Sequence, residues 1–88
     1  MNWQVYIILC SDQSLYTGIT TDVTRRFAEH VRGAGAKYFR GRAPRQLVYL
    51  ETGHDRSSAS RRELEIKRLS PAAKRALIAS PANKPATS

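Results

Sequence analysis

Apolar runs and turn-forming residues alternate in the first twenty positions of the chain. Residues 3–10 (WQVYIILC) are apolar, aromatic and β-branched, which is typical of a buried strand. Residues 11–14 (SDQS) have the composition of a turn, and residues 15–20 resume the apolar pattern. This short connection predicts an antiparallel hairpin. Gly18, inside the second strand, indicates a bulge or a close approach by another group.

A helical repeat follows the hairpin. The side-chain oxygens of residues 20–22 can cap a helix over residues 22–31. Val23, Phe27 and Val31 recur every four residues along this helix and predict one buried stripe. Two glycines shortly after the last of them end the helix.

The second half of the chain predicts further elements. They are a loop, a strand, a turn and two helices, over residues 32–45, 47–50, 53–56, 59–69 and 71–79. Ser57 or Ser58 caps the first of these helices. Ser70 followed by Pro71 is a typical start for the second one. The element order ββαβαα indicates a small α+β domain.

The length of 88 residues allows one domain and excludes a two-domain enzyme. We expect residues 1–79 to form that domain and residues 80–88 to form a disordered tail. Cys10 is the single cysteine, which excludes an internal disulfide framework, and its apolar surroundings predict a buried thiol. The apolar run over residues 5–10 is too short for a signal peptide or a membrane span, so we expect a cytoplasmic protein.

Charge narrows the class of partner. Lys and Arg number 15 against seven acidic residues, which gives a net charge of +8. Arginine dominates this excess and suits bidentate recognition of phosphate, so we expect nucleic acid rather than a membrane or an acidic protein. The loop over residues 32–45 contains no acid and could follow a phosphate backbone, with a flexible solvated loop as the alternative. The candidate nucleic-acid contacts are Arg25, Lys37, Tyr38, Arg40, Arg42 and Arg45.

Four residues of the hairpin and the first helix could carry chemistry. Tyr6 and Tyr16 lie on the two predicted strands and come close across the turn, although tyrosine is also common in half-buried strands. Arg26 presents a guanidinium fork that suits a phosphodiester, and a solvated helix charge is the alternative. His30 lies four residues later and could shuttle a proton or bind phosphate, with a polar surface histidine as the alternative.

Glu63 is the candidate metal ligand. Arginines and lysines surround it in the sequence, and a carboxylate within a basic surface can hold a divalent cation next to phosphate. A salt bridge to Lys67 at i+4 is the alternative. The sequence contains no P-loop, no dinucleotide-binding fingerprint and no metal-binding histidine pair. The residues by themselves therefore indicate a basic nucleic-acid-binding α+β domain that is compatible with metal-assisted nuclease chemistry.

The order and spacing of these residues resemble the GIY-YIG nuclease superfamily. The resemblance is carried by Val5-Tyr6-Ile7, Tyr16-Thr17-Gly18, Arg26, His30 and Glu63 within RRELEIK. The segments LYTGITTDVTRRFAEH, GAKYFRGR and DRSSASRRELEIKRLS resemble, more narrowly, the small single-domain bacterial branch known as UPF0213 or YhbQ-like. The resemblance covers about residues 3–79 and implies a three-stranded antiparallel sheet flanked by helices.

The resemblance also implies cleavage of a phosphodiester with one divalent metal, Mg²⁺ or Mn²⁺. Tyr6 or Tyr16 would orient or deprotonate the attacking water, and Gly18 would let backbone approach the site. Arg26 would stabilise charge on the scissile phosphate. By the same resemblance Glu63 is the metal ligand, His30 has a supporting or proton-transfer role, and Lys37 and Tyr38 contact substrate.

Two departures from the family pattern bear on activity. Val5 stands where the first tripeptide of the family has glycine, which alters a strand position and leaves the reactive group in place. Many family members carry an asparagine downstream of the glutamate, and Asn83, in the predicted tail, is the only asparagine after Glu63 here.

Three functions follow as hypotheses. The first is a metal-dependent nuclease of low sequence specificity that acts on DNA rather than RNA, with DNA repair or recombination as the process considered. The second is a catalytically weak or inactive nucleic-acid-binding module of the same fold. The third is a protein-interaction adaptor in such a process. We expect no membrane partner, and a monomer or a weak dimer.

Overall fold

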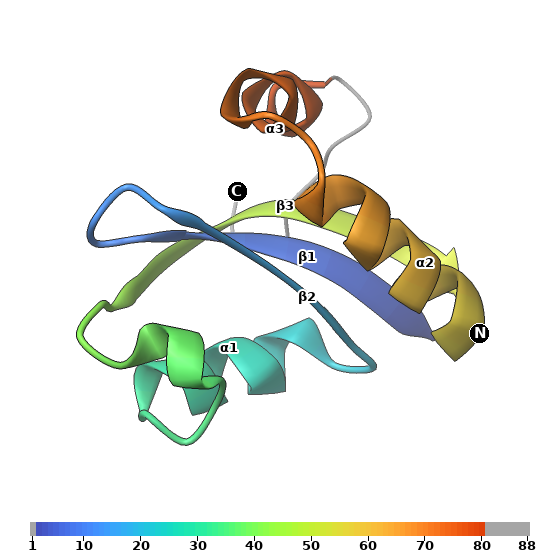
Figure 1. Ribbon diagram of the computed structural model, residues 1–88. Helices are drawn as coiled ribbons and strands as arrows, with labels where there is room; N and C mark the ends of the chain where they lie inside the picture. The colour runs from blue at the N-terminus through green and yellow to red at the C-terminus, as the bar shows by residue number, and fades with distance from the viewer. Residues whose placement is uncertain (1, 81–88) are drawn as a thin grey trace.

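The computed structural model describes residues 2–80, and its central layer is a three-stranded antiparallel sheet. The strands are β1 (Trp3–Cys10), β2 (Leu15–Thr20) and β3 (Pro44–His54), in the order β2-β1-β3 (Figure 1). β1 therefore has a hydrogen-bonded neighbour on both edges. The α+β class and the three-stranded antiparallel sheet expected from the sequence are confirmed.

Helices cover both faces of this sheet (Figure 1). α1 (Val23–Val31) and the 3₁₀ turn η1 (Lys37–Phe39) lie on one face, and α2 (Arg56–Lys67) and α3 (Pro71–Ile78) lie on the other. None of the helices within residues 2–80 is long and apolar enough to cross a bilayer. Of the predicted tail over residues 80–88, all but Ser80 lies outside the described residues.

Each face of the sheet has its own hydrophobic core, because the side chains of β1 alternate between the faces. The core on the α1 face contains Tyr6, Ile8, Cys10, Val23, Phe39 and Leu47. The core on the α2 face contains Val5, Ile7, Tyr49, Ala59 and Ile66. The buried thiol predicted for Cys10 is confirmed.

The β1–β2 hairpin has an uninterrupted register. Tyr6 pairs with Gly18 and Ile8 pairs with Tyr16, so the two tyrosines are diagonal neighbours on the same face. The register shows no shift at Gly18, so the bulge considered for this position is absent. The other prediction for Gly18, close approach by another group, remains.

The stripe predicted for the first helix is wrong at its last position. Val23 is buried and Phe27 packs against the same core, but Val31 is 59% exposed. At 100° per residue, position 31 has rotated by about 80° from Val23, whereas position 30 lies within about 20°. His30 therefore continues the buried stripe, with 1% of its surface exposed. A polar surface histidine, the alternative weighed for this position, is excluded.

The second half of the chain departs from expectation in its boundaries. β3 spans Pro44–His54 rather than residues 47–50, because pairing with β1 continues along its length and overrides the turn composition around Gly53. α2 begins at residue 56, and its N-cap is Asp55 rather than Ser57 or Ser58. The Asp55 carboxylate accepts a hydrogen bond from the Ser58 backbone N–H at 2.7 Å. The Ser58 hydroxyl oxygen in turn accepts one from the Asp55 backbone N–H, which completes a capping box.

Glu51 ties β3 to α2 through a polar network that the sequence did not reveal. Its carboxylate accepts hydrogen bonds from the Tyr49 hydroxyl at 2.6 Å and from Arg62 Nε at 3.1 Å. The ring of His54 contacts Glu51 at 2.5 Å and Ser58 at 2.9 Å. Burial raises the pKa of Glu51, but the hydrogen bonds from Tyr49, His54 and Arg62 outweigh it and leave that pKa lowered. The carboxylate therefore remains ionised and paired.

Truncation of Ile66 tests the core on the α2 face. Ile66 is fully buried, so Ile66→Ala should lower the free energy of unfolding by about 2–5 kcal/mol. Leu64→Ala is the matched control, because Leu64 is 50% exposed on the same helix, and its effect should stay within about 0.5 kcal/mol. Urea denaturation of both variants measures the difference, and equal effects would contradict this packing of α2.

Candidate active site

The structure gathers an aromatic cluster on the α1 face of the sheet. Tyr6 comes from β1, Tyr16 from β2 and His30 from α1. The ring centroids of Tyr6 and Tyr16 are 6.2 Å apart, and those of Tyr16 and His30 are 5.4 Å apart. Phe39 closes the group, 4.4 Å from His30 and 4.9 Å from Tyr16. Residues more than thirty positions apart in the sequence thus form one site.

Gly18 is required by the close approach of the tyrosines. A Cβ atom at this position would lie 2.5 Å from the Tyr6 hydroxyl oxygen and 3.1 Å from Cε2 of Tyr16. Because real contacts are not that short, any side chain here would displace the Tyr6 hydroxyl. Gly18 therefore leaves room for a tyrosine side chain.

His30 donates a hydrogen bond to Tyr6. The Ala36 backbone N–H donates to His30 Nδ1 at 3.3 Å, so Nδ1 carries a lone pair and the proton of the neutral ring lies on Nε2. His30 Nε2 lies 3.1 Å from the Tyr6 hydroxyl oxygen. Burial, followed by the positive charge of Arg26, lowers the pKa of His30, which favours the neutral ring. The Tyr6 hydroxyl thus accepts from His30, and its own proton must point elsewhere.

Gly35 shapes the loop that fixes this tautomer. A Cβ on Gly35 would overlap the imidazole of His30, so only glycine lets the backbone pass this close to the ring. The next residue, Ala36, supplies the amide that binds His30 Nδ1. The sequence pattern predicted only that this glycine ends the helix, and its contact with His30 was missed. The sequence carried no local signal for this contact, because the burial of His30 appears only in the structure.

The two tyrosines differ in their surroundings. Tyr6 is 1% exposed, and burial, followed by the nearby Tyr16, raises its pKa. The positive charge of Arg26 lowers the pKa of Tyr6, because its guanidinium lies close enough to interact with this hydroxyl. Tyr16 is only partly buried. The outer member of the pair is therefore Tyr16.

Arg26 lies beside this cluster and is held by a neighbouring acid. Its Nη1 contacts Glu29 Oε1 at 2.9 Å, and its side chain is 33% exposed. Glu29 also lies 3.9 Å from Arg25 Nε, and Arg25 is exposed. The hydrogen bond from Arg26 lowers the pKa of Glu29. Arg26 is thus oriented by a carboxylate while part of its guanidinium stays open to solvent.

The basic loop carries an ordered stack. The guanidinium of Arg42 lies 4.2 Å from the ring centroid of Tyr38, and the Tyr38 ring lies 5.1 Å from that of Tyr16. Asp12 in the hairpin turn binds Arg42 Nε at 3.3 Å and holds the stack in place. Further cations of the loop are exposed and form no ion pair among residues 2–80: Arg32, Lys37, Arg40 and Arg45. The loop therefore presents ordered rings beside open positive charge.

Glu63 lies on α2, the helix that covers the other face of the sheet (Figure 1). Its carboxylate binds Lys67 Nζ at 3.2 Å, so the salt bridge weighed as an alternative is present. The side chain of Glu63 is 24% exposed, compared with 65% for Glu65 on the same helix. The structure brings Tyr6, Tyr16 and His30 together, and it pairs Glu63 with Lys67 rather than with this group.

The candidate site offers a divalent metal one carboxylate ligand, that of Glu63. Residues 2–80 contain no group of three or more His, Cys, Asp or Glu side chains that could hold a metal. Mg²⁺ is commonly bound by one or two carboxylates, and waters and substrate phosphates complete its shell. A single accessible carboxylate such as Glu63 fits that mode and does not fit a closed, all-protein metal cage.

Comparison with known proteins identifies the class. The GIY-YIG catalytic domain matches residues 2–76, and the chain therefore belongs to the GIY-YIG family, a nuclease superfamily whose substrates are nucleic acids. The UPF0213 protein DP2720 of Desulfotalea psychrophila is 57% identical over 77 residues, which cover 86% of this chain and 70% of that protein. A UPF0213 protein of Cupriavidus necator is 51% identical over 85 residues, which cover 96% of this chain and 92% of the relative.

A solved structure agrees with this assignment. The solution NMR structure of the UPF0213 protein BH0048 from Bacillus halodurans matches with a TM-score of 0.57 and 49% identity. The match covers 89% of this chain and 83% of that one. The small UPF0213 branch expected from the sequence is thereby confirmed.

The tautomer of His30 can be observed directly. Nitrogen-15 NMR of untagged protein at pH 7 should show His30 as a neutral ring protonated at Nε2, because Nδ1 accepts from Ala36. The ring should also stay neutral near pH 6.5, where an ordinary histidine is half protonated, since the pKa of His30 is lowered.

The sequence offers a clean assignment for this spectrum. It contains two histidines, so His54→Gln leaves His30 as the only source of signal. A ring protonated at Nδ1, or a charged ring at pH 7, would contradict the direction of the hydrogen bond to Tyr6.

Proposed function

We propose that this chain is a metal-dependent nuclease that hydrolyses phosphodiester bonds in DNA with low sequence specificity. One observation carries the proposal: the hydrogen-bonded Tyr6–His30 pair lies beside Tyr16 and Arg26, next to the unpaired cations of the basic loop. Hydrolysis needs an oriented water and donors or cations that stabilise developing negative charge. The cluster supplies groups of both kinds.

The role proposed for each residue of the cluster follows from how exposed its side chain is. Tyr16 is the tyrosine that contacts the attacking water, because it is only partly buried whereas the Tyr6 hydroxyl lies under the surface. Tyr6 and His30 hold the rings in position and provide a donated hydrogen bond at the base of the site. Arg26 binds the scissile phosphate and stabilises its developing charge through the exposed part of the guanidinium.

Glu63 would hold Mg²⁺ or Mn²⁺ together with the phosphate oxygens of the substrate. A bound divalent ion supplies Lewis acidity that neutralises charge on the phosphate and leaving oxygen. In this structure Lys67 forms a salt bridge with the Glu63 carboxylate, and that salt bridge would have to break before a metal ion could bind.

The basic loop determines the class of substrate. Lys37, Arg40 and Arg45 are exposed and suited to backbone phosphates, and Arg25 extends this charge along α1. Tyr38 and Arg42 form a stack on which a base can rest. Backbone contact and stacking carry little sequence information, which supports low specificity. Action on DNA rather than RNA, a role in repair or recombination, and a cytoplasmic location stay predictions.

A nucleic-acid-binding module with little or no turnover is the second candidate. The pairing of Glu63 with Lys67 favours it, because the one candidate metal ligand is already neutralised. Asn83, the only residue that could serve as the downstream asparagine, lies outside the described residues.

A cleavage assay separates these candidates. Labelled single-stranded DNA, duplex DNA and RNA are each incubated with Mg²⁺, Mn²⁺ or a chelator. Glu63→Ala should reduce metal-dependent cleavage by about 100-fold or more and leave binding in a gel-shift assay nearly unchanged. Glu65→Ala is the matched control, since this exposed carboxylate faces away on the same helix, and it should retain activity.

The outcomes are distinct. Cleavage by wild type and Glu65→Ala but not by Glu63→Ala establishes the enzyme and rules out a contaminating nuclease. Intact binding without cleavage by wild type establishes the binding module. Loss of binding and cleavage together in Glu63→Ala would count against its metal role.

Neutralisation of the loop should change the salt dependence of binding. The double variant Arg40→Ala/Arg42→Ala removes one candidate phosphate ligand and the cation of the Tyr38 stack, so binding should weaken and the slope of log K against log salt should fall by about one. Arg61→Ala, on the exposed surface of α2, is the control. Fluorescence anisotropy with a labelled oligonucleotide between 50 and roughly 200 mM salt measures both slopes. Equal slopes in the two variants would exclude the loop as the binding surface.

A further inference from the structure

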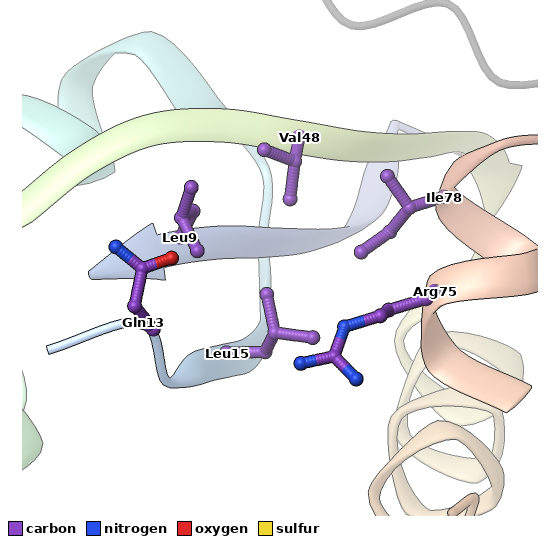
Figure 2. A pocket seen from close by; sticks show the side chains of 6 residues that line it. All are labelled: Leu9, Gln13, Leu15, Val48, Arg75 and Ile78. Carbon is purple, nitrogen blue, oxygen red and sulfur yellow. The ribbon is translucent and has the colours of Figure 1, made fainter. Parts of the chain in front are cut away.

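An aliphatic groove lies on the face of the sheet opposite the aromatic cluster of Tyr6, Tyr16 and His30. It runs between the tip of the β1–β2 hairpin and α3 (Figure 2). Leu9, Leu15, Val48 and Ile78 provide its apolar walls. The cavity measures about 170 Å³. An aliphatic cavity of about 150 Å³ is able to hold benzene, so this one accommodates a single aliphatic side chain.

A second pocket extends the groove along the start of α3. It measures about 240 Å³ and shares Gln13, Leu15 and Arg75 with the first. Ser14 and Lys74 also line it and bring polar groups to its edge. The two pockets together therefore form one apolar compartment with one polar end.

The groove carries positive charge without a matching acid. Arg75 reaches from α3 toward Leu15 of β2, and Lys74 precedes it on the helix (Figure 2). Among residues 2–80 neither cation forms an ion pair, and no acidic residue lines either pocket. Asp12 is the nearest acid in the hairpin, and Ser14 and Arg42 already bind it. The charge of the groove therefore favours an occupant with negative charge.

The chemistry of the walls favours a polypeptide over nucleic acid. Bases bind on aromatic side chains, and the aromatic residues of this protein's cluster all lie on the α1 face. The groove offers only aliphatic walls, Gln13 and Ser14 as hydrogen-bonding groups, and two cations. These groups match an aliphatic anchor flanked by carboxylates, and the charges match in sign.

We propose that this groove binds a short segment of another protein in which a leucine-sized side chain stands beside carboxylates. The aliphatic side chain fills the compartment formed by Leu15, Val48 and Ile78, and a carboxylate pairs with Arg75. The docking surface uses none of the residues assigned to the nuclease site, and it lies on the face of the sheet opposite the Tyr6, Tyr16 and His30 cluster. It gives a small nuclease domain a means of attachment that leaves the basic loop free for its substrate.

Titration by NMR tests this surface without any measure of cleavage. The probe is the acetylated and amidated peptide Glu-Leu-Glu-Glu-Leu-Glu, added to nitrogen-15-labelled protein. Saturable shifts should appear at the amides of Leu15, Val48 and Arg75, with a dissociation constant of about 0.1–1 mM, as expected for one anchor and one charged pair. The peptide Lys-Leu-Lys-Lys-Leu-Lys should cause none of these shifts.

Two charge-reversal variants separate a built site from general attraction. Arg75→Glu should weaken binding of the acidic peptide about tenfold or more, since it removes a charged pair and adds repulsion. Arg61→Glu changes the net charge by the same amount outside the groove and should bind like wild type. Both residues are exposed, so both variants should retain the dispersed spectrum of the folded protein.

Three results would overturn the proposal. They are an absence of saturable shifts at 5 mM peptide (roughly five times the weakest affinity expected), equal weakening by the two variants, and shifts confined to the α1 face. A dT12 oligonucleotide that shifts the groove residues and displaces the peptide would assign the groove to nucleic acid instead. A protein that binds the peptide but cleaves nothing keeps the docking surface and loses the nuclease function.

Discussion

The rest of the structure depends on the burial of β1 on both faces and its pairing on both edges. Val5 and Ile7 support the core under α2, while Tyr6 and Ile8 support the core over α1. A shift of one residue in this strand would exchange these two sets of side chains. The position of the Tyr6 hydroxyl is therefore fixed by the same apolar contacts that stabilise the fold.

The candidate site is organised by a backbone amide as much as by side chains. Ala36 fixes the proton of His30 on Nε2, and that proton fixes the orientation of the Tyr6 hydroxyl. Gly35 makes the arrangement sterically possible. A loop without regular secondary structure thus controls a buried polar contact, and the low local dielectric makes that contact costly to break.

The sequence predicted the elements and most of the cluster for identifiable reasons. The β1–β2 hairpin followed from two short apolar, β-branched and aromatic runs joined by a short polar turn, both of which are local signals. β3 was predicted seven residues too short, because its ends are stabilised by β1 rather than by their own composition. To place His30 on the buried face of α1, the true rotation per residue of an α-helix was needed, because a simple repeat of four residues selects Val31 instead.

The network around Glu51 had no local signal, since it joins residues from different elements. The short turn was sufficient to predict that Tyr6 and Tyr16 come close, whereas the choice between a bulge and close approach at Gly18 required the register of the hairpin. The relation of Glu63 to the tyrosines was beyond sequence reasoning, since it depends on how α2 crosses the opposite face of the sheet.

The tip of the β1–β2 hairpin serves both faces of the molecule. Asp12 holds Arg42 and, through it, the stack on the basic loop, while the next residue, Gln13, lines the aliphatic groove. Gln13 is the only non-glycine residue within the described range with a positive φ, at 70°. The backbone N–H groups of Cys10 and Gln13 donate to the carbonyl oxygens of Ser14 and Cys10, and these bonds connect the two sides of the tip. A ligand that displaced the tip from one face would therefore alter the free energy of binding at the other, and thermodynamic reciprocity would make the two effects equal.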